Sequence, residues 1–268
     1  MSDKPVVLTI EDGIAEIRLN RPKVLNAVTR DMLKMLRDYV AEIAGRDDVG
    51  VCVIAGEGRG FCAGADLTDP MMGGDLPRPE RGQNCIDVMD AEINAMVRDF
   101  HTLQLPKLAV VNGIAAGGGF GLALVADIVI AGRSASFLEP FVPKLGLIPD
   151  LGGTWHLAHG LGRARAIGVS MLGEPLSAEQ AAEWGLIWKC VDDDKLQDEA
   201  KAIAVKLRDG PKRAQTALPG LIDRAFLSTF SDQLDAERDA QSVLCQTEDA
   251  EEAVTAFREK RAPRFNGR

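Results

Sequence analysis

The sequence predicts an α/β body followed by a helical C-terminal segment. Short apolar runs rich in β-branched residues recur along the N-terminal part, as is typical of buried strands. Two of these runs lead into glycine-rich stretches, and after about Lys189 only helical spacing of apolar residues remains. Strands followed by a run of helices indicate a body with a helical appendage. We therefore expect a core over residues 1–195 and a helical oligomerisation segment over residues 196–268.

Local patterns predict the elements of the body in order. A hairpin is expected where alternating strands flank Asp12-Gly13, and Thr29 is suited to cap the next helix. Three prolines and three glycines among mixed charges predict a mobile loop over Asp69–Gln83. The expected elements are strands over 6–10 and 14–19, a helix after 29, a strand over 49–55, the loop, a helix over 84–103, and a strand, glycine turn, short helix and strand over 108–131.

Cap and break residues organise the second half. Ser177 with Gln180 forms a capping box, Gly185 is suited to end that helix, and Gly210-Pro211 predicts a break among the last helices. These last helices carry more apolar side chains than peripheral helices readily bury on one body, which indicates an interface. The side chains concerned are Ile203, Leu207, Leu221, Ile222, Phe226, Leu234, Val243, Leu244, Val254 and Phe257.

Composition excludes several classes of function. The net charge of -9 over 268 residues argues against a general nucleic-acid surface. The five cysteines include no CxxC pair, which favours buried free thiols in a reducing compartment. The N-terminus lacks a signal-peptide pattern, and the glycine cluster within Leu108–Gly132 favours a buried strand–helix–strand over a membrane span. We expect a cytoplasmic protein that contacts neither membrane nor nucleic acid.

The two glycine-rich stretches, Gly56–Leu67 and Asn112–Gly121, carry most of the functional information. Glycines at the end of a strand leave backbone N–H groups uncovered, because no side chain blocks a ligand. Two such turns side by side could aim two N–H donors at one oxygen, as in an oxyanion hole. The alternative is that both clusters only permit tight packing. The chain contains no P-loop, GxGxxG or GxSxG motif, and His156 and His159 lack a third metal ligand nearby, so no metal site is expected.

These stretches resemble those of the crotonase, or enoyl-CoA hydratase/isomerase, superfamily. The matching motifs are Asn20-Arg21-Pro22-Lys23, Leu25-Asn26-Ala27, Phe61–Leu67, Asn112–Gly119 and Gly146–Thr154. The second half is most similar to the epoxyphenylacetyl-CoA isomerase branch, which acts in phenylacetate degradation, over Gly146–Trp155, Gly162–Ala166, Leu176–Ala181, Glu183–Trp188 and Lys260–Phe265. The resemblance implies a spiral of ββα units with a C-terminal trimerisation segment, and hence a homotrimer or a dimer of trimers.

The resemblance also implies an acyl-CoA site. It places the two oxyanion donors at the backbone N–H groups of Ala65 and Gly118, which would hold the thioester carbonyl and stabilise an enolate. Lys23 could pair with a coenzyme A phosphate, and a solvated loop lysine is the competing interpretation, while Lys260 either ends a charged helix or reaches the coenzyme A of a neighbouring subunit. The implied coenzyme A contacts are Lys23, Val24, Ala63, Ala65, Asp66, Leu67, Thr68, Gly118 and Lys260. Coenzyme A would enter as part of the substrate, so no separate cofactor is expected.

The acid/base group is the decisive question. Hydratases of the superfamily use two glutamates, which would fall at Gly121 and at Phe141 or Val142, since this chain is one residue longer between Phe137 and Gly146. Neither position is acidic. Glu139 lies close in sequence but precedes a proline and is out of register.

Asp150 is therefore the candidate proton carrier. It lies in an apolar stretch, where desolvation would raise its pKa and suit it to proton transfer near neutral pH. The epoxyphenylacetyl-CoA isomerases carry their catalytic aspartate at this place, whereas the competing interpretation is a helix N-cap. One carboxylate can move a proton between carbons, so an isomerase is favoured. An enoyl-CoA hydratase and a non-catalytic acyl-CoA-binding protein remain the alternatives.

Overall fold

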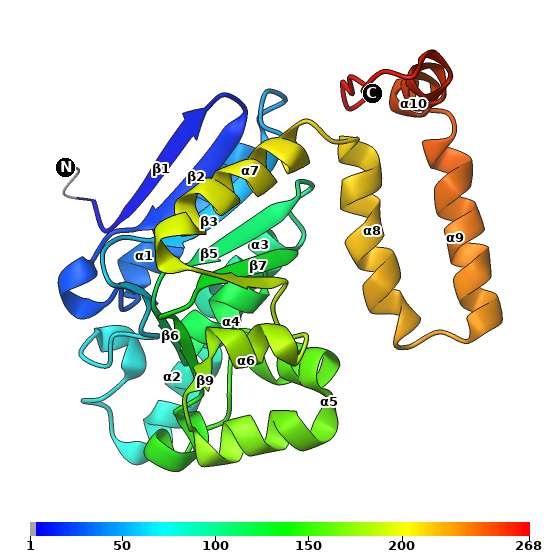
Figure 1. The fold of residues 1–268 in the computed structure, drawn as a ribbon. Coiled ribbons are helices and arrows are strands. Elements are labelled where there is room, and N and C mark those ends of the chain that lie inside the picture. Colours follow the sequence, from blue (N-terminus) through cyan, green and yellow to red (C-terminus); the bar gives the residue numbers. More distant parts are fainter. Residues whose placement is uncertain (1–3) are drawn as a thin grey trace.

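The computed structural model describes residues 4–268 as an α/β body from which the last three helices extend to one side (Figure 1). This arrangement confirms the predicted fold class. Residues 1–3, on which the signal-peptide argument partly rests, lie outside the described residues. Within the described range, no helix combines the length and the apolar character needed to span a membrane.

Two sheets form the body. In the larger, six-stranded sheet only the β1–β2 hairpin is antiparallel, and the order is β1 (Val6–Glu11), β2 (Ile14–Leu19), β3 (Val51–Gly56), β5 (Lys107–Val111), β7 (Ile128–Gly132) and β10 (Lys189–Val191). The smaller, four-stranded sheet has the order β4 (Gly60–Cys62), β6 (Ile114–Ala116), β8 (Ser136–Leu138) and β9 (Leu176–Ser177).

The chain winds as the expected spiral of ββα units. The pairs β3–β4, β5–β6 and β7–β8 each place one strand in the larger sheet and the next in the smaller sheet, and a helical segment follows each pair. The helices of the body are α1 (Arg30–Ala44), α2 (Arg78–Val88), α3 (Asn94–His101), α4 (Gly118–Leu124), α5 (Gly153–Leu172), α6 (Ala178–Glu183) and α7 (Leu196–Arg208).

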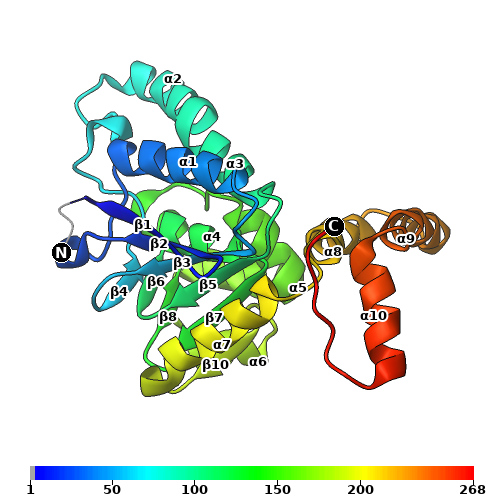
Figure 2. The same cartoon turned by 90° about the horizontal axis from the view of Figure 1, so that it is seen from above.

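The larger sheet is covered on both faces. Alternate residues of β3 point to opposite sides, so that Val51 and Val53 pack against α7 while Cys52 and Ile54 join the main core. Figure 2 shows α1 and α3 on one side of the sheet and α7 on the other. Helix α7 thus belongs to the body, and the outlying part of the chain begins after it.

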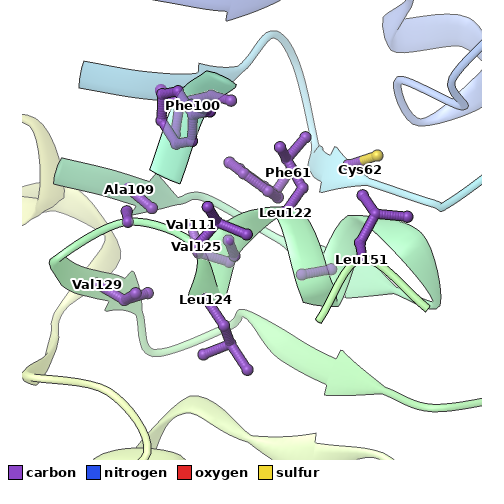
Figure 3. Packing of buried hydrophobic residues seen from close by; sticks show 14 of the residues in the cluster. Phe61, Cys62, Phe100, Ala109, Val111, Leu122, Leu124, Val125, Val129 and Leu151 are labelled. Atoms are coloured by element: carbon purple, nitrogen blue, oxygen red, sulfur yellow. The ribbon is translucent and has the colours of Figure 1, made fainter. Parts of the chain in front are cut away.

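Helix α4 lies in the middle of the core, and this position fixes the site described below. Its residues after Gly118 are all buried, and Leu122 packs with Phe61 and Val111 in the main cluster (Figure 3). A helix that is apolar on all sides must be enclosed. The strand–glycine turn–helix predicted for this region is therefore confirmed, although the short strands β4 and β6 were not predicted.

Several local predictions are confirmed and two are wrong. The side chains of Thr29 and Ser177 accept hydrogen bonds from the N–H groups three residues later, as predicted for caps. The expected loop over Asp69–Gln83 instead contains a 3₁₀ turn at Pro70–Met72, and α2 begins at Arg78 because proline is tolerated in the first turn of a helix. Lys189–Val191 forms strand β10 rather than helix, since it pairs with β7.

The outlying helices bury little apolar surface on their own chain. Helices α8 (Lys212–Ala225) and α9 (Phe230–Leu244) pack on each other, and α10 (Glu248–Glu259) lies beyond them (Figures 1 and 2). Phe226 reaches the body through an edge-on contact with His159. In contrast, Leu227, Phe230 and Phe257 are 91%, 80% and 85% exposed. Large apolar side chains left exposed on outlying helices are typical of interaction surfaces.

We expect the protein to be a homotrimer or a dimer of trimers, with closed symmetry. Replacing Leu227 and Phe230 together by aspartate should dissociate the assembly, because two charges would enter the apolar surface. Gln241→Asp, a charge on an exposed polar position of α9, should leave it intact. Light scattering at micromolar concentration gives the molecular mass of the wild type and of both variants. A stable wild-type monomer would refute the prediction.

Candidate active site

Glycines bring the two predicted glycine-rich stretches into direct backbone contact. A Cβ atom at Gly64 would lie 2.8 Å from the Ala116 carbonyl oxygen and 3.4 Å from the Gly118 nitrogen. A Cβ atom at Gly119 would collide with the carbonyl group of Cys62. The loop after β4 and the start of α4 can approach this closely only without side chains.

The N–H groups of Ala65 and Gly118 have no acceptor in the part of the chain that the structure describes. A parallel bridge joins Val28 to both neighbours of Ala65, through the Gly64 carbonyl and the Asp66 N–H at 2.8 Å each, and so leaves the Ala65 donor free. Gly118 is the first residue of α4, where an N–H has no partner within the helix. Both predicted oxyanion donors are therefore available to a ligand.

A cavity of about 330 Å³ opens beside these donors. Ala65, Gly118 and Asp150 lie on its wall, so the structure brings the three predicted catalytic residues together. Most of the remaining wall is apolar: Val28, Leu33, Leu36, Leu67, Met71, Met72, Val88, Met89, Ile93, Met96, Leu122, Phe141, Leu145, Leu147 and Leu151. A largely apolar cavity with a few polar groups is the usual form of a small-molecule site.

The carboxyl group of Asp150 lies beside Gly118. A Cβ atom at Gly118 would lie 3.5 Å from the Asp150 Oδ1 atom, and this buried oxygen has no hydrogen-bond partner in residues 4–268. Burial raises the pKa of Asp150 to about 6. Helix α5 begins after Gly152 without a side-chain cap, so the alternative interpretation of Asp150 as an N-cap is wrong.

The turn that carries Asp150 packs closely against α4 at Gly121. A Cβ atom at Gly121 would lie 2.8 Å from the Leu151 Cβ atom and 3.0 Å from the Asp150 carbonyl oxygen. The position at which the resemblance places a hydratase glutamate therefore has no room for a side chain. Phe141 lines the cavity and brings no carboxylate. Among the described residues of the wall, Asp150 is the only acid.

Sequence reasoning set Glu139 aside as out of register, and the structure shows it to be a buried acid near the site. Its side chain is 1% exposed, and its Oε2 atom has no hydrogen-bond partner in the described part of the chain. Burial, reinforced by the nearby charge of Asp150, raises its pKa to about 8. The chain is one residue longer than the family pattern between Phe137 and Gly146, and this stretch contains a π-helical turn at Phe141–Leu145. Counting residues along the family pattern therefore could not place Glu139. An isolated acid between apolar neighbours was the available clue.

Apart from Ala65 and Gly118, the predicted coenzyme A residues divide into four groups. Ala63 and Leu67 line the cavity. Lys23 and Val24 are exposed and lie just before Asn26 in the sequence. Asp66 and Thr68 bind each other at 2.6 Å through the Thr68 hydroxyl, and Asp66 also accepts from Arg21 at 3.0 Å. Lys260 caps α10, is absent from the cavity wall of its own chain, and lies among the outlying helices (Figure 1).

Asn26 explains why the Leu25-Asn26-Ala27 motif belongs to this site. Its side chain is fully buried and donates to the carbonyl groups of Gly60 and Phe61 at 2.8 and 3.1 Å. The Asn26 amide oxygen accepts from the Arg21 N–H at 2.8 Å. One buried amide thus ties the loop before α1 to β4, which leads into the Ala65 donor.

A family model described as enoyl-CoA hydratase/isomerase matches residues 9–268, and the chain belongs to this family. It is 42% identical over 259 residues to 1,2-epoxyphenylacetyl-CoA isomerase from Escherichia coli K12, covering 97% of each chain. It is 38% identical over 268 residues, the full length of both chains, to a probable enoyl-CoA hydratase from Rhodobacter capsulatus. The solved structure of a putative enoyl-CoA hydratase from Streptomyces coelicolor A3(2) matches with a TM-score of 0.90 at 32% identity, covering 99% of this chain and 95% of that one.

Gly121→Ala should displace the turn that carries Asp150. We expect a loss of about 1–3 kcal/mol of stability from overpacking and a fall in turnover of about 100-fold, since small misplacements of a reacting group are costly. Gly168→Ala is the matched control, because its Cβ atom would meet nothing within 4 Å and helical alanine is favourable. Thermal unfolding and turnover are measured together, and a Gly121→Ala protein that matches wild type in both would contradict the packing argument.

Proposed function

We propose that the protein is an acyl-CoA isomerase that stabilises a thioester enolate and uses Asp150 as its proton carrier. The observation that supports this most directly is the convergence of one desolvated carboxyl and two free backbone donors on one apolar cavity. Ala65 and Gly118 would donate to the thioester oxygen, and each such donor contributes roughly 3 kcal/mol in a transition state.

The proposed reaction moves one proton between two carbons. Ionised Asp150 removes a proton from the carbon next to the thioester carbonyl, and the electron pair moves onto the carbonyl oxygen held by the two donors. Asp150 then returns the proton to a different carbon, and the enolate electrons shift to form the new double bond. A pKa of about 6 suits this role, because the group is ionised at neutral pH and still binds a proton readily.

The favoured substrate is 1,2-epoxyphenylacetyl-CoA, which would open and expand to its oxepin, or an enoyl-CoA whose double bond shifts. The Escherichia coli relative supports the first substrate by its name. The apolar cavity suits an aromatic or aliphatic acyl group, and Met71, Met89 and Met96 give its wall an adaptable shape.

An enoyl-CoA hydratase is the second candidate, since the Rhodobacter capsulatus relative is named as one. Hydration requires water to be activated while a proton is delivered to carbon, and two carboxylates normally share these tasks. Only Asp150 supplies a carboxylate on the described cavity wall. A non-catalytic acyl-CoA-binding role is disfavoured because an unpaired buried carboxyl has an energetic cost that binding alone does not explain.

Asp150→Asn should lower turnover by about 100-fold or more while the fold and coenzyme A binding persist, because the amide cannot carry the proton. Epoxyphenylacetyl-CoA and a 3-enoyl-CoA serve as substrates, followed by absorbance and mass. Asp47→Asn, at an exposed position, is the matched control. Turnover within a few-fold of wild type would remove Asp150 from the mechanism.

Crotonyl-CoA should be hydrated weakly or not at all, since no second carboxylate lines the described cavity wall. The assay follows loss of enoyl-thioester absorbance together with the mass gain of one water molecule. Efficient water addition would overturn the isomerase proposal in favour of a hydratase.

A further inference from the structure

Glu139 is a buried acid that the proposed proton transfer does not use. It follows β8 directly and lies behind the cavity, whose wall includes the next two residues, Pro140 and Phe141, but not Glu139 itself. The backbone around it is held firmly, since the Leu138 carbonyl accepts the Gly117 N–H at 2.9 Å. A buried polar group without a partner is rare in folded proteins and calls for an explanation.

The Glu139 carboxyl lies against the first turn of α5, immediately after Asp150. A Cβ atom at Gly153 would lie 3.5 Å from the Glu139 Oε1 atom, and the Gly153 N–H donates to the Asp150 carbonyl at 2.7 Å. Both carboxyl groups carry one buried oxygen without a partner in residues 4–268. A protonated Glu139 that donates toward Asp150 through a water molecule would satisfy both oxygens.

The surroundings favour a single proton on this pair. Strand β6 and helix α4, which lie next to it, carry no ionisable side chain. On α5, burial lowers the pKa of His156 to about 4, so that this imidazole is neutral at neutral pH. Lys144 is exposed and lines the cavity. Burial raises the pKa of Glu139 to about 8 and that of Asp150 to about 6, so the pair binds one proton near pH 7 and Glu139 is the more basic of the two.

We propose that Glu139 is a positioning residue that keeps one proton beside Asp150 and thereby holds the Asp150 carboxylate ionised and oriented toward the cavity. The inference rests on the proposed role of Asp150 as proton carrier. During turnover Asp150 gains the substrate proton and returns it, while Glu139 retains its own proton throughout, so the count of protons balances. Loss of the Glu139 proton would place a second negative charge near the developing enolate and oppose its formation.

The pH dependence of kcat/KM tests the proposal. The wild-type rate should rise as Asp150 ionises near pH 6 and fall as Glu139 ionises near pH 8. Glu139→Gln keeps the size of the side chain and a hydrogen-bond donor but cannot ionise, so the acid limb should remain and the alkaline limb should disappear. Glu174→Gln is the control, because Glu174 is exposed and follows the end of α5 in the sequence. This variant should keep both limbs of the pH profile. An alkaline limb that persists in Glu139→Gln would overturn the proposal.

Infrared spectroscopy of the unliganded protein provides a second test that needs no turnover. Wild-type protein at pH 7 should show a protonated-carboxyl band that is lost as the pH rises through about 8 and is absent in Glu139→Gln. Lack of such a band in the wild type would refute the inference even if the variant failed to fold. An active Asp150→Asn protein that retained the band would instead count against the proposed proton carrier, so the two failures are distinguishable.

Discussion

The close approach of the turn carrying Asp150 to helix α4 is the contact on which the rest of the site depends. Leu151 adopts a left-handed backbone conformation, with φ of 48°, which costs about 1–2 kcal/mol for a residue with a Cβ atom. Its side chain belongs to the main core cluster (Figure 3) and packs on α4 at Gly118 and Gly121, and burial of a leucine contributes about 1.5–3 kcal/mol. Packing of Leu151 thus offsets the strain and fixes the neighbouring Asp150 beside Gly118.

Close backbone contacts also set the positions of the two N–H donors, Ala65 and Gly118. Their positions are set by Gly64 and Gly119, which let the loop after β4 touch the start of α4, and not by side chains that could adopt other rotamers. Preorganised donors of this kind need little reorganisation when charge develops on a substrate oxygen. Asp150 is then the group that changes state in the proposed reaction, because it gains and returns a proton.

Features encoded by neighbouring residues could be predicted from the sequence, and features created by distant contacts could not. The β1–β2 hairpin, the Thr29 cap and the glycine turn before α4 each depend on a few consecutive residues, and all three were predicted. Strands β4 and β6 are only three residues long and exist because they pair with each other across the spiral. The burial of Glu139 likewise depends on α5, which lies well beyond it in the chain.

The segment between β8 and Asp150 is anchored at both ends and forms a π-helical turn between them. Its start is anchored where Leu138 binds Gly117, and its end is anchored where Leu151 rests on Gly121. The intervening π-helical turn lies within the stretch that is one residue longer than expected, and its residues Phe141 and Leu145 line the cavity. Side chains of the π-helical turn itself can therefore change without moving either anchor. Substitutions at Phe141 or Leu145 would therefore change the shape of the acyl pocket while Ala65, Gly118 and Asp150 keep their places.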